Sequence, residues 1–137
     1  MSTYLLILRC TIPAVVQVGA IGPVAVTPGC YLYVGSARRC LAARLARHQR
    51  SQKRRHWHID YLLAGGVLHI KEIWTTACLA ECALASALLS LPASTVAHPR
   101  LGASDCRCPA HLLRWQDSLP ALRRLLPHWG LSQYPPP

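Results

Sequence analysis

The spacing of apolar and polar residues predicts several β-elements in the first third of the chain. Residues 3–9 are β-like and contain a short continuous apolar run at Tyr4–Ile7, which is typical of a buried central strand. Two valine-rich pieces flank a glycine-containing turn within residues 14–26, and this pattern predicts a β-hairpin. A turn then leads into residues 30–35, where Tyr31 and Tyr33 share one face of the next strand because side chains alternate.

Helical spacing follows this strand. Residues 37–49 predict a helix with Ser36 as its N-cap, and one stripe of this helix holds Leu41, Arg44, Leu45 and His48. The apolar part of that stripe is expected to pack on the sheet, while most of the arginines face water.

The second half of the chain shows a weaker pattern. Residues 57–63 predict a short ordered segment, and residues 67–76 are β-favouring and predict a third core strand. Residues 77–91 predict a helix that ends at the following proline. A second, weaker helical pattern covers residues 112–126.

These elements predict an α+β fold, a small α/β sandwich. Its central three-stranded sheet is flanked by helices, and the valine-rich hairpin is inserted between the first two strands. With 137 residues and 52% apolar content, the chain is long enough to bury one core. We expect a single domain over residues 1–130 and a flexible, proline-rich tail over residues 131–137.

The net charge of the chain indicates a class of binding partner. Fifteen Lys and Arg against five Asp and Glu give a net charge of +10, and the first acidic residue is Asp60. A basic surface of this kind favours a nucleic acid, most plausibly DNA, although charge runs are often only solvated. The cationic residues expected to contact it, besides Arg44, are Arg38, Arg39, Arg47, Arg50, Lys53, Arg54 and Arg55.

The cysteines and the apolar segments indicate in which cellular compartment to expect the protein. Seven cysteines are an odd number, and the chain opens without the pattern of a signal peptide, so we expect reduced thiols and a cytoplasmic protein. The apolar run at residues 5–8 is too short to span a bilayer, and Glu81 interrupts the apolar stretch at 76–91. We therefore expect no membrane partner.

A candidate catalytic element begins at Tyr33-Val34-Gly35-Ser36-Ala37. A strand that ends in a tyrosine, a glycine at the turn and a following helix would bring a phenol close to Arg44 and His48. These two residues are spaced i, i+4 and so project from one helical face. A phenol, a guanidinium and an imidazole suit a phosphodiester, because they orient water, hold the phosphate and move protons.

Glu81 is a second candidate, because it shares its expected helical stripe with Leu84 and Leu88. A carboxylate on a stripe that packs against a sheet needs a cation. The cation could be one divalent metal whose other ligands are water and phosphate oxygens, or it could be Arg44 in a structural ion pair. Because Glu81 accompanies the candidate catalytic Tyr, Arg and His residues, we favour the metal.

Together these residues resemble the GIY-YIG nuclease superfamily. Tyr33-Val34-Gly35 resembles its YIG element, and Ser2-Thr3-Tyr4 resembles a GIY element of which the tyrosine remains. The Arg44 and His48 pair and Glu81 match the family's helix and its metal-binding glutamate. Residues 57–62 (WHIDYL) and 104–112 (SDCRCPAHL) resemble the signatures of one uncharacterised branch, in which the domain is sometimes fused to DNA-repair glycosylases.

The resemblance implies a metal-dependent DNA endonuclease or nicking enzyme with one Mg²⁺ or Mn²⁺, possible DNA-repair partners and a role in repair. Tyr4 or Tyr33 would help to deprotonate or position water, Arg44 would hold the phosphate, and His48 would assist proton movement. Glu81 would bind the metal. A phenol ordinarily titrates near pH ~10, so nearby cations would have to favour the phenolate.

Three features depart from the family pattern. The first element lacks its Gly and Ile, and a hairpin separates Tyr4 from Tyr33. The chain also contains no Asn, so the supporting Asn of the family is absent, and Asp105 or His111 are the candidates to replace it.

Cys106, Cys108 and His111 form a competing candidate site for zinc, with Cys78 or Cys82 as a fourth ligand. Structural zinc usually draws on two separated ligand pairs, so we expect reduced cysteines here rather than zinc.

His58 and Asp60 are two residues apart and would face one side of an extended segment. Either His58 is a second proton carrier or phosphate contact, or the two form a structural pair. Two alternatives to an enzyme also stay open. One is a catalytically silent nucleic-acid-binding module with the same fold, and the other is a protein-interaction domain whose charge serves solubility.

Overall fold

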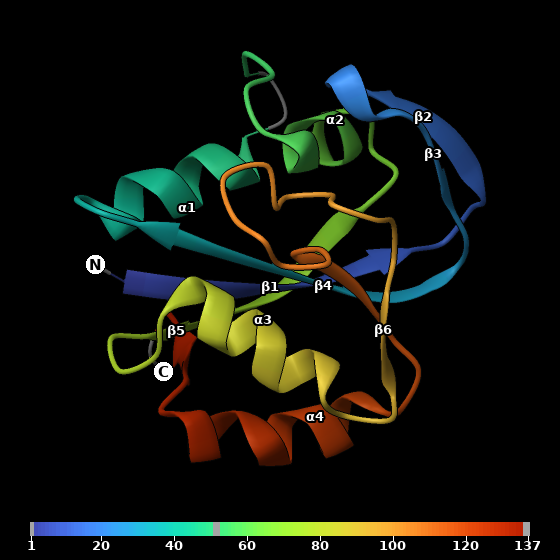
Figure 1. Ribbon diagram of the computed structural model, residues 1–137. Helices are drawn as coiled ribbons and strands as arrows, with labels where there is room; N and C mark the ends of the chain where they lie inside the picture. The colour runs from blue at the N-terminus through green and yellow to red at the C-terminus, as the bar shows by residue number, and fades with distance from the viewer. Residues whose placement is uncertain (1, 51–52, 136–137) are drawn as a thin grey trace.

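The computed structural model describes residues 2–50 and 53–135 and has an α+β architecture (Figure 1). Its main sheet has six strands in the order β6-β7-β4-β1-β5-β8, and every neighbouring pair is antiparallel. The predicted fold class is therefore confirmed, but the three-stranded central sheet is wrong. The three predicted strands form the middle of a wider sheet.

The middle of the sheet contains β1 (Ser2–Cys10), flanked by β4 (Gly29–Ala37) and β5 (His69–Thr76). All three have the apolar, β-branched or aromatic content that favours a buried strand. Three shorter strands extend the edges: β6 (Ser94–Val96), β7 (Leu112–Trp115) and β8 (Ser132–Tyr134).

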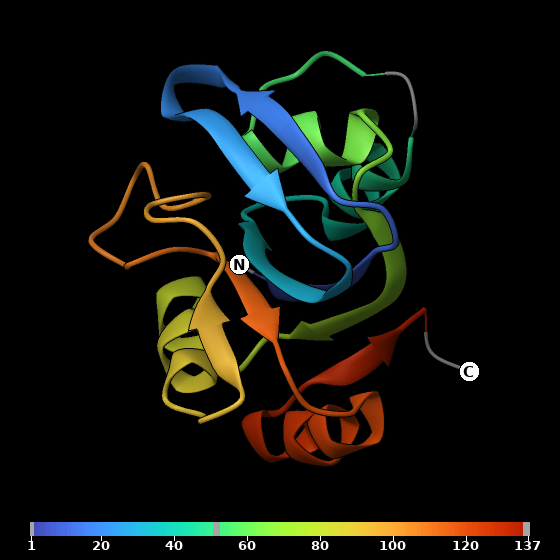
Figure 2. The same ribbon diagram turned by 90° about the vertical axis from the view of Figure 1, so that its right-hand side faces the viewer.

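The alternation of side chains along β1 divides the interior into two cores. Tyr4, Leu6 and Leu8 belong to one core, and Leu5 and Ile7 belong to the other. The first core lies beneath α1 (Leu41–Gln49), α2 (His58–Ala64) and the hairpin, and the second beneath α3 (Glu81–Leu89) and α4 (Leu119–Leu125). Figures 1 and 2 show these groups on opposite faces of the sheet.

The predicted hairpin is confirmed. It consists of β2 (Ala14–Val18) and β3 (Gly22–Val26), joined by the short helix η1 (Gly19–Ile21). The two strands form a separate sheet, and Val18, Val24 and Val26 anchor it to the first core. Their alternation with exposed residues explains why the pattern was visible in the sequence.

Helix boundaries differ from the sequence pattern at two places. Ser36 and Ala37 do not begin α1, because they continue β4 and pair with Thr3 and Ser2. The N-cap residue of α1 is Cys40. In the same way, α3 begins at Glu81, later than the predicted helix over residues 77–91.

The C-terminal region differs more. The predicted helix over residues 112–126 is instead β7 followed by α4, whose first turn is capped by the Ser118 hydroxyl accepting from Ala121 N–H. The helix η2 (Leu126–Trp129) continues from α4. The segment predicted as a flexible tail holds β8, which pairs with β5, while residues 136–137 lie outside the described residues. Within the described ranges, no helix is both long and apolar enough to cross a bilayer.

Candidate functional site

A pocket of about 620 Å³ brings together five of the six residues predicted for catalysis or metal binding. They come from β1, β4, α1, α2 and α3, so the pocket lies where these elements meet. The five are Tyr4, Tyr33, Arg44, His58 and Glu81. Arg38, Arg39 and Asp105 also line the pocket, together with residues that the sequence patterns did not single out as functional, among them Trp57, Gly102 and Ser104.

The pairing of β1 with β4 places the Tyr4 phenol. Tyr4 lies directly opposite Gly35 in the antiparallel register. A Cβ atom at Gly35 would lie 2.4 Å from Cζ and Oη of Tyr4, closer than any real contact. Gly35 is therefore required for the close approach of the phenol to the strand rather than for a tight turn.

Behind the pocket, the Tyr4 hydroxyl lies 2.6 Å from Nε2 of His48, and both side chains are buried. Burial lowers the pKa of His48 to about 4, and the positive charge of Lys53 contributes to the same shift. His48 is therefore neutral near pH 7, and its Nε2 shares a hydrogen bond with the Tyr4 hydroxyl. His48 does not line the pocket wall itself but supports Tyr4 from the inside.

The expected phenolate is not favoured in this environment. Burial raises the pKa of Tyr4 far above its ordinary value, and the opposing effect of Arg44 is smaller. Burial likewise raises the pKa of Tyr33, whose ring packs edge-on against His48. Both tyrosines are neutral hydroxyl groups near pH 7.

Arg44 is held at the pocket by two contacts. Its Nη1 donates to the carbonyl oxygen of Ser36 at 2.6 Å, and its Cζ lies 4.4 Å from the centre of the Trp57 ring. Such a guanidinium over an aromatic face is fixed in position while it keeps further N–H donors. Trp57 thus acts as a platform for Arg44.

His58 and Asp60 do not form the pair that an extended segment would allow, because residues 58–64 are helical. Asp60 instead accepts two hydrogen bonds of 2.9 Å from Arg47. It also caps α2 by accepting from Trp57 N–H. Burial of Asp60 opposes ionisation, but these bonds outweigh it and lower the pKa of the carboxyl.

His58 is turned toward the loop after β6. Its Nδ1 accepts a hydrogen bond of 2.9 Å from the backbone N–H of Gly102. This contact leaves the proton of the neutral ring on Nε2. Partial burial lowers the pKa of His58, so the neutral form is favoured near pH 7. His58 therefore offers the pocket an N–H donor.

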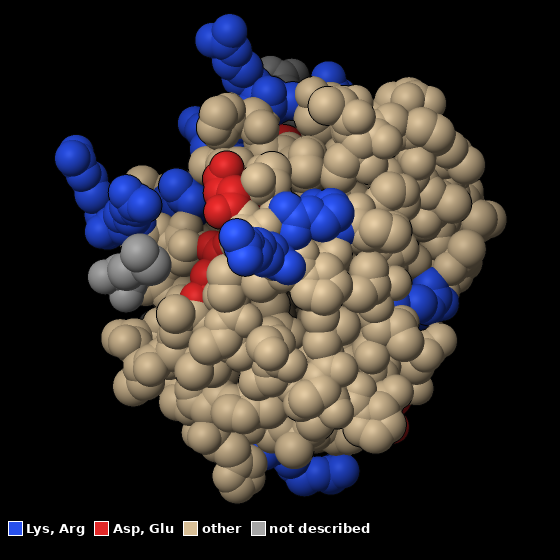
Figure 3. All heavy atoms as spheres, viewed as in Figure 1, with Lys and Arg blue, Asp and Glu red and all other residues tan. Residues whose placement is uncertain are grey.

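The Lys and Arg residues predicted to contact nucleic acid fall into two groups, one bonded to other parts of the protein and one exposed. Arg47 is engaged by Asp60, and Lys53 donates to the carbonyl oxygens of Arg47 and His48 at the end of α1. Arg38, Arg39, Arg50, Arg54 and Arg55 are exposed. On the face in Figure 3, Lys and Arg side chains gather over the end of β4 and α1.

Glu81 lies at the start of α3 and has partners on both carboxylate oxygens. The Ser36 hydroxyl donates to Oε1 at 2.6 Å, and Nδ1 of His111 lies 2.8 Å from Oε2. Burial opposes ionisation of Glu81, but the interactions with His111 and Ser36 outweigh it and lower the pKa of the carboxyl. Arg44, the alternative partner considered from the sequence, contributes only a weaker electrostatic effect.

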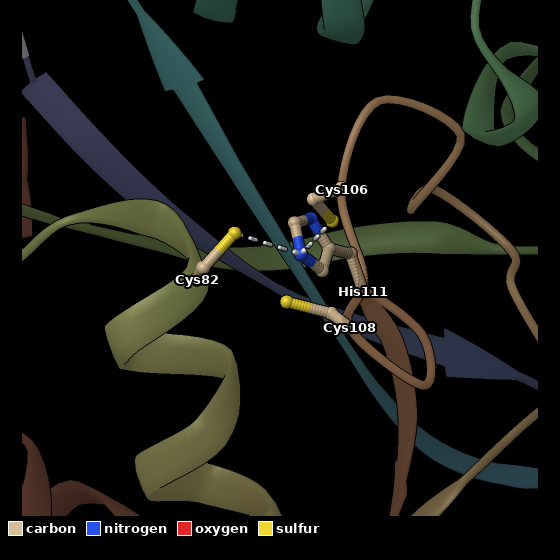
Figure 4. Close-up of side chains that lie close together, drawn as sticks. All are labelled: Cys82, Cys106, Cys108 and His111. Atoms are coloured by element: carbon tan, nitrogen blue, oxygen red, sulfur yellow. Dashed lines mark hydrogen bonds between the residues drawn. The ribbon is translucent and has the colours of Figure 1, made fainter.

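The expectation of Mg²⁺ or Mn²⁺ as cofactor, with zinc disfavoured, is wrong. Sulfur and nitrogen atoms of four side chains gather behind Glu81, all within 4.8 Å of one another. Such ligands favour a zinc-like ion over Mg²⁺ or Mn²⁺, which prefer oxygen. The four residues are Cys82, Cys106, Cys108 and His111, and Figure 4 shows their side chains pointing toward a common centre.

Comparison with known proteins shows the family. A family model described as "Domain of unknown function DUF123" matches residues 3–128, so the chain belongs to this family. Neither a curated protein nor a solved structure matches the chain.

The contact between Gly35 and Tyr4 yields a stability prediction. We expect Gly35→Ala to lower the free energy of unfolding by about 2 kcal/mol, because the added methyl group overpacks the phenol. Urea denaturation measures the loss. In a Tyr4→Ala background the same change should cost clearly less, and an equal cost in both backgrounds would contradict the contact.

The buried His48 yields a pH prediction. Its folded pKa of about 4 lies below the ordinary 6.5, so the unfolded chain binds more protons between these values. Stability therefore falls as the pH drops, by about 2 kcal/mol from pH 7 to pH 5. His48→Gln, which keeps an acceptor for Tyr4, should remove this part of the pH dependence in urea denaturation. Equal slopes in the two proteins would refute the assignment.

Proposed function

We propose that the protein is an endonuclease or nicking enzyme that hydrolyses phosphodiester bonds in DNA. The observation that carries this proposal is the convergence of Tyr4, Arg44 and His58 on one solvent-reachable pocket with arginines at its rim. The resemblance to GIY-YIG nucleases supports the same function, because four of the five residues that match the family's motifs line this pocket. The function of the DUF123 family itself is unknown.

The charges around the pocket favour a polyanion. Exposed Arg38 and Arg39 line the opening, and exposed Arg50, Arg54 and Arg55 lie in the segment between α1 and α2. These cations can contact phosphates on either side of the cleavage point, and their binding would weaken steeply with salt. Arg47 and Lys53 serve the fold and contribute less directly.

Inside the pocket, Arg44 is the proposed phosphate-binding residue. Its contacts with Ser36 and Trp57 hold the guanidinium in place before substrate arrives. A preorganised donor stabilises the charge that develops on the phosphate oxygens in the transition state. His58 would add its Nε2–H as a second donor.

Tyr4 and His48 form the proposed proton path. The attacking water gives its proton to the Tyr4 oxygen while the phenolic proton passes to Nε2 of His48, to which it is already hydrogen-bonded. The water oxygen bonds to phosphorus, the bond between phosphorus and the leaving oxygen breaks, and the leaving oxygen takes a proton from solvent. His48 then returns the proton it received through Tyr4 to solvent. This relay needs no phenolate at rest, in agreement with the raised pKa of Tyr4. A bound phosphate anion would favour the imidazolium, since it offsets the nearby cations.

The proposal predicts the behaviour of two variants in a plasmid assay. Wild-type protein should convert supercoiled DNA to the nicked form, and Tyr4→Phe and Arg44→Gln should each slow this conversion about 100-fold or more. Cleavage is measured on gels with supercoiled plasmid and labelled branched duplexes, in buffers that include a chelator control.

Two control variants remove a phenolic hydroxyl and a guanidinium outside the pocket. Tyr31→Phe deletes a hydroxyl that contacts Thr27 away from the pocket, and Arg124→Gln deletes an exposed charge on α4. Both should cleave like the wild type. DNA binding without cleavage would contradict the enzyme and favour the silent nucleic-acid-binding module. A failure to bind DNA or RNA at low salt would favour the protein-interaction domain.

A further inference from the structure

The side-chain cluster behind Glu81 has the composition and geometry of a closed zinc site. Nε2 of His111 lies 3.5 Å from Sγ of Cys106 and 3.9 Å from Sγ of Cys82. In a tetrahedral zinc site with metal–sulfur distances of about 2.3 Å and metal–nitrogen distances of about 2.0 Å, neighbouring sulfurs are about 3.8 Å apart, and the nitrogen is about 3.5 Å from each sulfur. The cluster, including Cys108, needs only a small contraction to reach this geometry.

We propose that these four side chains bind one structural zinc ion. Three thiolates and one imidazole complete the coordination, as in structural sites that leave no open position. The fourth ligand is Cys82 rather than Cys78, which stands before α3 and is not part of the cluster. The three thiols release their protons when the metal binds.

Glu81 is a positioning residue of this site. Its Oε2 lies 2.8 Å from Nδ1 of His111, while Nε2 of the same ring faces the cysteines. A carboxylate on the far nitrogen fixes the tautomer and orientation of a zinc-binding histidine. The side chain that the sequence assigned to a catalytic metal therefore acts on the ligand of a structural one.

The loop that carries Cys106 and Cys108 is held from outside. Arg100 donates to the carbonyl oxygens of both cysteines. Its positive charge also offsets the net negative charge of a zinc ion with three thiolates.

Two segments that contribute zinc ligands also contribute residues to the pocket. Cys82 follows Glu81 at the start of α3, and the cysteine loop follows Gly102, Ser104 and Asp105. The ion would link these two segments in addition to the contact between Glu81 and His111. Loss of the metal should therefore loosen this side of the pocket.

Metal content tests the proposal without any activity assay. Full-length protein purified under reducing conditions without chelator should contain about one zinc per chain by elemental analysis. Cys106→Ser and Cys82→Ser should each lose most of it, and Cys78→Ser should keep it. A zinc content near zero that added zinc does not raise, or an equal content in all variants, would overturn the site.

Two further measurements cover variants that fold poorly. Wild-type protein loaded with Co²⁺ should show sulfur-to-cobalt charge-transfer and tetrahedral ligand-field absorption, and a spectrum of oxygen-only coordination would overturn the ligand set. Competition with a chromophoric chelator gives zinc affinity. Glu81→Ala should weaken it about 10–100-fold and Glu81→Gln, which keeps an acceptor, by less. Unchanged affinity in Glu81→Ala would refute the positioning role, whether or not the protein cleaves DNA.

Discussion

The antiparallel register between β1 and β4 is the constraint on which the pocket depends. It sets Tyr4 opposite Gly35 and Thr3 opposite Ser36, so the phenol lies over a position that has no side chain. A slip of one residue would turn Tyr4 toward the other core, because side chains alternate across the sheet. Burial on both faces makes such a slip costly, and the register is therefore strongly specified.

Several polar side chains buried beside this register contact one another. Tyr4 meets His48, Arg47 meets Asp60, and Glu81 lies between Ser36 and His111. The Tyr4–His48 and Ser36–Glu81 contacts hold α1 and α3 on the sheet, as the apolar cores do, and the Arg47–Asp60 contact joins α1 to α2. Because a partner left alone in the interior would be severely destabilising, these contacts also restrict how the pocket can rearrange.

The central strands and the hairpin could be predicted because each carries a complete apolar pattern of its own. The short outer strands could not, since β6, β7 and β8 have only three or four residues and gain their stability from neighbours. Five of the six residues predicted for catalysis or metal binding line the pocket. They could be predicted because the spacing of the motifs follows from the strands and helices that carry them. The partners of Glu81 could not be predicted, since Ser36 and His111 come from other segments and the pattern had placed Ser36 at a helix boundary. The pairing of Asp60 with Arg47 could not be predicted either, because the sequence pattern suggested an extended segment where the structure has α2.

The hairpin between β1 and β4 has a consequence for the order of folding. These two strands are neighbours in the sheet but are separated in the chain by residues 11–28, and pairing them requires closing that loop. The β2–β3 hairpin has a short connection and forms contacts of low sequence separation. Once it is formed, it brings the ends of the intervening segment together, so a local event lowers the entropic barrier to the long-range pairing that creates the pocket.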